Sequence, residues 1–203
     1  MSDERTINIA FFDSEFTATS ANNRGMQEMI QFALVIYECE KSGDDIVVRF
    51  SEDPIYTYSE FVKPTYQLKL SDYIKKLTGI KQDDVNDGAT MSEAIDTIYN
   101  AIVKNNVKRT FVWGPDEMML RKNFGIIEHD KKKTNKILRT MKDVSSDISK
   151  AYGFETPVSQ HKMCELLKVE EKGRAHDAYY DALNLFRILN SFSGKIPVEY
   201  ILK

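Results

Sequence analysis

The chain has 203 residues, of which 42% are hydrophobic, and a formal net charge of −3 at pH 7. These values are typical of a globular protein with one hydrophobic core, and the small negative charge argues against indiscriminate binding to duplex nucleic acid, which usually needs a basic excess. The longest candidate apolar run, residues 32–37, is far shorter than the roughly 18 residues of a membrane helix, so we expect no membrane partner.

The start of the chain and its cysteines indicate a cellular compartment. The first residues, Met-Ser-Asp-Glu-Arg, lack the basic and apolar regions of a secretory signal. Cys39 and Cys164 form neither a disulfide framework nor a metal-binding motif. We therefore expect a cytoplasmic protein.

The first part of the chain reads as strands. Residues 7–12 are apolar at nearly every position, which is typical of a central strand covered on both faces. Residues 30–38 and 46–62 follow as strand candidates, separated by a turn at 41–44, and the second is broken at 51–54. This order predicts an antiparallel meander.

Helical patterns then alternate with strands. A helix at 71–77 would end at Gly79, and another would begin at Met91 after Thr90 as its N-cap. Residues 110–113 read as a strand, and 138–144 are a candidate fifth strand. Further helices are predicted at 116–123, 148–152, 162–167 and 177–190.

These elements predict an α/β fold with a mixed sheet of about five strands, an antiparallel meander followed by parallel strands, flanked by helices. The layout resembles that of ribonuclease H-like domains. We expect one domain over residues 1–190. The tail at 191–203 alternates apolar and other residues, so it is a candidate edge strand within the domain or across a dimer, which leaves a monomer and a homodimer both open.

An acidic pair ends the first strand. Asp13 and Glu15 are two residues apart, so their carboxylates point to the same face. Adjacent like charges cost free energy unless a cation lies between them, and Mg²⁺ prefers carboxylate oxygens. The pair is therefore a candidate metal site, although a solvated strand end would also accommodate two acids.

A third acid follows the strand at 110–113. Asp116 comes directly after Gly114 and Pro115, at the end of a strand, where the sites of α/β proteins usually form. The pattern also fits a helix N-cap at Asp116, and Glu117 is an alternative candidate for the same role.

The last predicted helix carries a fourth acid. Asp181 lies beside the buried stripe of this helix and needs a partner, and His176 precedes the helix in a flexible loop. His129 and His161 lie in polar sequence surroundings without matching partners, so His176 is the functional candidate, although a capping or surface role would also fit it.

One segment is strongly basic. Residues 121–142 contain eight basic and two acidic side chains, a net charge of +6 in a chain of −3. The segment reads either as a solvated helix face or as a rim that contacts phosphates.

Together these motifs resemble the DEDDh subgroup of DnaQ-like 3′-to-5′ exonucleases. The matching stretches are FFDSEFT at 11–17, EMIQFA at 28–33, LTGI at 77–80, VWGPD at 112–116 and HDAYYD at 176–181. The branch most similar in appearance contains KapD-type bacterial proteins and enzymes that trim small RNAs. Many members have two residues between the glycine and the third acid, whereas here only Pro115 stands between them, so the choice between Asp116 and Glu117 stays open.

The resemblance implies a mechanism. Asp13, Glu15, Asp116 and Asp181 would hold two Mg²⁺ or Mn²⁺ ions, and His176 would act as the general base. Nucleoside 5′-monophosphates would leave from the free 3′ end of single-stranded RNA or DNA. The resemblance also places Phe16 and Thr17 beside the terminal nucleotide.

Two other functions are weighed against this one. A catalytically silent ribonuclease H-like module would bind nucleic acid or a protein without cleaving anything. A phosphohydrolase of the HD type would use His176 and Asp177 as metal ligands, but that fold is all-helical and this chain opens with strands.

Overall fold

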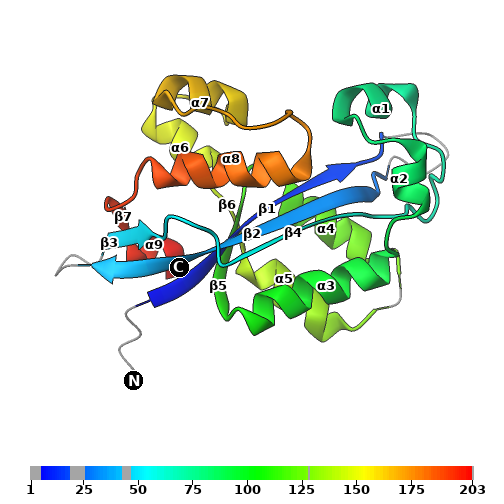
Figure 1. The fold of residues 1–203 in the computed structure, drawn as a ribbon, viewed down its shortest axis with the longest axis horizontal. Helices are drawn as coiled ribbons and strands as arrows, with labels where there is room; N and C mark the ends of the chain where they lie inside the picture. The colour runs from blue at the N-terminus through cyan, green and yellow to red at the C-terminus, as the bar shows by residue number, and fades with distance from the viewer. Residues whose placement is uncertain (1–5, 19–25, 43–46, 128, 203) are drawn as a thin grey trace.

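The computed structural model describes residues 6–18, 26–42, 47–127 and 129–202 (Figure 1). The strands are β1 (Thr6–Phe16), β2 (Met29–Ser42), β3 (Val47–Phe50), β4 (Tyr56–Phe61), β5 (Val107–Val112), β6 (Met141–Asp143) and β7 (Ile196–Pro197). The helices are α1 (Asp72–Thr78), α2 (Gln82–Asn86), α3 (Met91–Lys104), α4 (Asp116–Phe124), α5 (Lys131–Thr140), α6 (Ser145–Ala151), α7 (Gln160–Leu167), α8 (Ala178–Asn190) and α9 (Val198–Leu202).

The strands form one mixed sheet in the order β6-β5-β1-β2-β3-β7, with β4 also paired to β2. β1 runs antiparallel to β2 and parallel to β5, and β5 runs parallel to β6. The predicted fold class is confirmed. The described residues contain seven strands rather than about five, because residues 46–62 divide into β3 and β4 and the tail adds β7.

Helices cover both faces of the sheet: α6, α7 and α8 on one side, α3, α4 and α5 on the other (Figure 1). The alternation of side chains along β1 assigns residues to these faces. Ala10 and Phe12 pack in the core on the α3 side, whereas Ile9 and Phe11 pack in the core that contains Ala182 of α8. The central strand is therefore buried on both faces, as its continuous apolar run indicated.

The segment at 138–144 and the tail differ from the prediction, and the helix α2 was not predicted. The strand expected at 138–144 is limited to β6, because Thr134, Ile137 and Leu138 are buried at helical spacing and continue α5 up to Thr140. The tail forms the two-residue strand β7 and then α9, in which Val198 and Ile201 are buried three residues apart. β7 pairs with β3, so this edge pairing lies within the chain. The domain limit at residue 190 stays a prediction.

Among the described residues, no helix has both the length and the apolar character that crossing a membrane requires.

Candidate active site

The acids of β1 point toward α8. Asp13 and Glu15 continue the odd-numbered face of the strand, on which Ile9 and Phe11 contact the α8 side of the core. Asp181 lies in the first turn of α8. The period of the strand thus turns both carboxylates toward the helix that carries the fourth predicted acid.

A cleft of about 430 Å³ opens at this end of the sheet. The predicted site residues among its lining are Asp13, Glu15, Phe16, Asp116, His176 and Asp181. The other lining residues are Ser14, Gln27, Trp113, Pro115, Met119, Ser159, Gln160, His161, Glu171 and Ala175. Segments separated by more than 160 residues of sequence therefore meet in one concave site.

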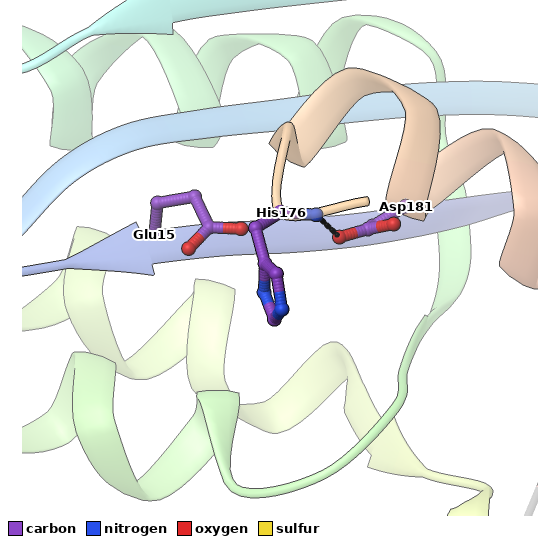
Figure 2. Close-up of side chains that lie close together, drawn as sticks. All are labelled: Glu15, His176 and Asp181. Atoms are coloured by element: carbon purple, nitrogen blue, oxygen red, sulfur yellow. Dashed lines mark hydrogen bonds between the residues drawn. The ribbon is translucent and has the colours of Figure 1, made fainter. Parts of the chain in front are cut away.

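Glu15, His176 and Asp181 form a candidate metal-binding group in the cleft (Figure 2). One potential ligand atom from each side chain lies within 4.8 Å of the other two. The backbone N–H of His176 donates a hydrogen bond to Asp181 Oδ2 at 2.9 Å, and His176 adopts the left-handed conformation with φ of 63°. This local bond fixes the loop that presents the imidazole to the acids.

The neighbouring strand positions the start of α8. Gln31 of β2 lies opposite Glu15 in the sheet. Its Oε1 accepts from the backbone N–H of Ala178 at 3.2 Å, and its Nε2 donates to Asp177 Oδ1 at 3.5 Å. Asp177 also accepts from the backbone N–H of Tyr179 as the N-cap of α8. One buried amide of β2, the strand paired with β1, thereby holds the start of the helix that carries Asp181.

The structure places Asp116, and not Glu117, in the cleft. Asp116 is only 6% exposed, and Ser14 Oγ donates a hydrogen bond to its Oδ1 at 2.6 Å. Glu117 accepts hydrogen bonds from Arg121 one turn along α4 and does not line the cleft. Of the two acids left open by the shortened Gly-Pro-Asp stretch, Asp116 is the one that lies in the cleft, and its role as a metal ligand stays a prediction.

Burial and mutual repulsion raise the pKa values of the β1 acids. Burial is the largest cause of a pKa of Asp13 well above its usual value, and the charges of Asp116, Asp181 and Glu15 raise it further. Burial, followed by the charges of Asp181 and Asp116, raises the pKa of Glu15 to about 8. Without a neighbouring cation, these carboxylates therefore hold their protons to a higher pH than free side chains do.

The other two acids follow the same pattern, with partial compensation. Burial raises the pKa of Asp116 to about 6, against the opposing effect of the hydrogen bond from Ser14. Burial raises the pKa of Asp181 to about 7, although the backbone N–H of His176 lowers it. Since perturbed pKa values gather at functional sites, this crowding marks the cleft as chemically specialised.

The donor set fits divalent cations. Carboxylate oxygens are the ligands that Mg²⁺ and Mn²⁺ prefer, and an imidazole is a common additional ligand for Mn²⁺ and related ions. None of the described residues lining the cleft is a lysine or an arginine. A bound cation would therefore supply the charge that the protein itself does not place there.

The two residues predicted beside the terminal nucleotide lie differently. Phe16 lines the cleft and packs partly against the core. Thr17 is fully buried and does not line it; its hydroxyl accepts from the backbone N–H of Glu28 at 3.0 Å, and its N–H donates to Glu28 O at 2.8 Å. The predicted contact of the Thr17 side chain with a nucleotide is not supported, because the chain closes β1 against β2 at this point.

Several lining residues escaped the sequence analysis. His161 was set aside for want of a partner, but its Nδ1 lies 2.6 Å from Glu171 Oε2 and both residues line the cleft. Ser14 was passed over between the two acids, although its polar side chain within an otherwise buried strand was a usable signal. The basic segment 121–142 contributes no residue to the described lining.

Comparison with known proteins identifies the family. The sequence matches the Exonuclease family, RNase_T, over residues 10–189. The chain belongs to this family. A search of curated proteins gave no match.

Solved structures, two of them described as exonucleases or nuclease domains, share the fold. A 3′-exonuclease described in specific recognition of the histone mRNA stem-loop superposes with a TM-score of 0.72 at 18% identity, covering 91% of this chain and 63% of its own. The nuclease domain of 3′hExo, a DEDDh family member bound to rAMP, gives 0.65 at 19%, covering 94% of each chain. Pop2p of S. pombe, bound to Mg²⁺ and Mn²⁺, gives 0.64 at 15%, covering 96% of this chain and 85% of its own. Family and fold together indicate a nuclease.

Proposed function

We propose that this family member is a metal-dependent 3′-to-5′ exonuclease that shortens RNA or DNA from a free 3′ end and releases nucleoside 5′-monophosphates. The observation that carries the proposal is the convergence of Glu15, His176 and Asp181 within 4.8 Å in the cleft that also holds Asp13 and Asp116. The superposed structures support it, since they include a 3′-exonuclease that recognises a histone mRNA stem-loop and Pop2p in a form bound to Mg²⁺ and Mn²⁺.

The site residues have three kinds of role in this proposal: binding the ions, accepting a proton and stacking on the base. Asp13, Glu15, Asp116 and Asp181 would hold the divalent ions, which would stabilise the negative charge that develops on the phosphate. His176 would accept the proton of the attacking water on a ring nitrogen, since its intrinsic pKa suits proton transfer near neutral pH. Phe16 would stack on the terminal base without selecting its sequence.

Degradation of end-labelled oligonucleotides tests the proposal. Matched single-stranded RNA and DNA carrying a 5′ label would be incubated with Mg²⁺ or Mn²⁺, and a ladder of single-nucleotide steps with released 5′-monophosphates is expected. A circular oligonucleotide is the control for the need for a 3′ end. Asp116→Asn should lower the rate at least about 100-fold, because several kcal/mol of charge stabilisation depend on the ions.

Glu117→Gln is the matched control, because it removes a neighbouring charge that lies outside the cleft, and its rate should stay within about twofold of wild type. His176→Ala should lower the rate roughly 10²- to 10⁴-fold while ion binding is largely kept. Wild-type protein that binds the oligonucleotide yet releases no nucleotide with either ion would contradict the proposal and favour the catalytically silent module.

A further inference from the structure

Exposed aromatic and basic side chains gather in the segment between β4 and α2. Tyr66, Leu68 and Tyr73 are 60%, 59% and 65% exposed and fall within eight residues. We call the exposed basic, aromatic and aliphatic side chains of this segment the lysine–tyrosine surface: Lys63, Tyr66, Leu68, Lys69, Tyr73, Lys76 and Lys81. Large apolar groups left in water at this density mark an interaction site rather than ordinary surface.

The segment is basic in an acidic protein. Residues 63–81 contain five lysines and one acid, Asp72, so the local charge is +4 where the whole chain carries −3. Lys75 pairs with Asp72 at 3.6 Å, a contact within the first turn of α1. The remaining excess of positive charge complements a polyanion.

A buried carboxylate holds the segment in place. Glu28 is 1% exposed, and its two oxygens accept hydrogen bonds from three consecutive backbone N–H groups: Thr65 at 2.6 Å, Tyr66 at 3.0 and 3.1 Å, and Gln67 at 2.7 Å. Hydrogen bonds to a charged acceptor are about twice as strong as neutral ones. The backbone that carries Tyr66 is therefore fixed before any ligand arrives.

Two connections place this surface beside the cleft. Glu28 directly follows Gln27, which lines the cleft. On the other flank, Arg174 Nη2 donates to the backbone oxygens of Lys76 at 2.8 Å and Leu77 at 3.3 Å, and His176 of the cleft lies two residues further on. Figure 1 shows α1 near the end of β1 and the first turn of α8.

We propose that the lysine–tyrosine surface binds the single-stranded nucleic acid whose 3′ end occupies the cleft, an inference that rests on the proposed function. Tyr66 and Tyr73 stack on bases upstream of the terminal nucleotide, and the lysines contact the phosphates. The cleft itself repels a polyanion, since its described lining is rich in carboxylates and holds no lysine or arginine. Without bound ions, affinity for the upstream part of the strand therefore comes from a neighbouring surface.

Binding without turnover tests this inference. The probe is a 5′-fluorescein single-stranded 12-nucleotide oligomer, followed by fluorescence anisotropy in EDTA. The double variant Tyr66→Ala, Tyr73→Ala should raise the dissociation constant at least about 10-fold, because stacking of each base on an aromatic ring is worth about 1–3 kcal/mol. The Tyr66→Phe, Tyr73→Phe variant keeps both rings and should restore most of the affinity.

Tyr152→Ala is the matched control, because Tyr152 is also exposed, at 42%, but lies at the end of α6. It should leave the dissociation constant within about twofold. Lys69→Gln and Lys76→Gln should each reduce the slope of log affinity against log salt by about 0.7, the value for one phosphate contact on a single strand.

The outcomes separate this inference from the proposed function. Wild-type protein that degrades oligonucleotides, together with Tyr66 and Tyr73 variants of unchanged affinity and unchanged thermal stability, would overturn the inference alone and point to a protein partner for this surface. Wild-type protein that binds through the two tyrosines but degrades nothing would overturn the nuclease function and leave the inference standing.

Discussion

Asp13 lies among more like charges than any other group described in the cleft. Its burial, together with Asp116, Asp181 and Glu15, raises its pKa well above the usual range of an aspartate. Charged carboxylates in such a setting cost free energy, and a divalent cation removes that cost by taking the place of the protons. The same repulsion that destabilises the isolated protein thus favours metal binding.

The side chain of Ser14 lowers the pKa of one of these acids, Asp116. Its hydroxyl donates to Asp116 at 2.6 Å and lowers a pKa that burial raises to about 6. Ser14→Ala should therefore move the pKa of Asp116 upward and weaken Mn²⁺ affinity by about 10-fold or more near pH 6, as removal of groups behind metal ligands commonly does. Isothermal titration at pH 6 and pH 8 measures this effect.

The loss of affinity should be smaller at pH 8, where Asp116 is ionised in both proteins. Ser51→Ala is the control, because that hydroxyl is exposed and donates to Asp53 O far along the chain from the cleft. Equal losses at the two pH values would show that Ser14 acts through packing instead of through the charge of Asp116.

The sequence singled out three of the acids because each obeys a local rule. Asp13 and Glu15 are two residues apart on a strand, and Asp181 lies beside the buried stripe of a helix. Their positions in the cleft agree with that reasoning. The pairing of His161 with Glu171 joins a helix to a loop ten residues away, and no periodicity reports such a contact.

At the scale of elements, the loop before α8 depends on its backbone conformation. Gly173 has φ of 67° and His176 has φ of 63°, both in the left-handed region. A Cβ on Gly173 would lie 2.0 Å from the ring of Tyr180, closer than atoms can approach. Glycine is thus required twice over at this position, by conformation and by space.

Gly173→Ala should therefore displace the loop that carries His176 and lower the rate of oligonucleotide degradation by about 10-fold or more, since displacements near 1 Å at a reacting group are costly. Gly153→Ala is the matched control, because Gly153 has φ of 82° but a Cβ there would meet nothing within 4 Å. Steady-state kinetics and thermal melting of both variants distinguish the effect of the clash with Tyr180 from the effect of the left-handed backbone conformation.

Both substitutions should cost similar backbone strain, about 1 kcal/mol, and the clash with Tyr180 should lower the melting temperature of Gly173→Ala further. The double variant Gly173→Ala, Tyr180→Ala removes the ring that the new Cβ would meet and should recover part of the rate. A rate for Gly173→Ala equal to that of Gly153→Ala would show that the loop tolerates the clash by moving Tyr180.

Elements with strong periodicity were predicted well, and those decided by tertiary contacts were not. The continuous apolar run of β1 and the spaced apolar residues of α8 gave their type directly. The stretch at 138–144 was misread in part because Ile137 and Leu138 serve α5, while only Met141–Asp143 pair with β5. The alternating apolar residues of the tail likewise predicted an edge strand, whereas most of this stretch forms the helix α9.

At the scale of the whole molecule, the acidic cleft links stability to pH. In the folded protein the pKa of Glu15 is about 8 and that of Asp181 about 7, both above the values of free side chains. The folded state therefore holds more protons than the unfolded state between about pH 4 and pH 8, and the contribution of these groups to stability falls as the pH rises through that window.

Thermal melting in EDTA should accordingly show wild type losing stability, relative to the Glu15→Gln variant, between pH 5 and pH 8. Each kcal/mol corresponds to about 2–4 °C for a chain of this size. Added Mn²⁺ should restore the melting temperature of wild type more at pH 8 than at pH 5, because the ion competes with protons for the carboxylates. Glu38→Gln, an exposed acid on β2, should follow wild type. A wild-type melting temperature that rises with pH in EDTA would contradict this assignment.

The distance in sequence between β1 and α8 has a consequence during synthesis. Asp13 emerges from the ribosome first, whereas Asp181 follows 168 residues later (181 − 13). Asp181 joins the other acids when α8 packs onto β1 and β2, so charge repulsion opposes this late step as well as the earlier approach of Asp116 to β1. A nascent chain would therefore carry no assembled cleavage centre, and the surrounding pool of divalent ions would promote the final docking of α8 that creates it.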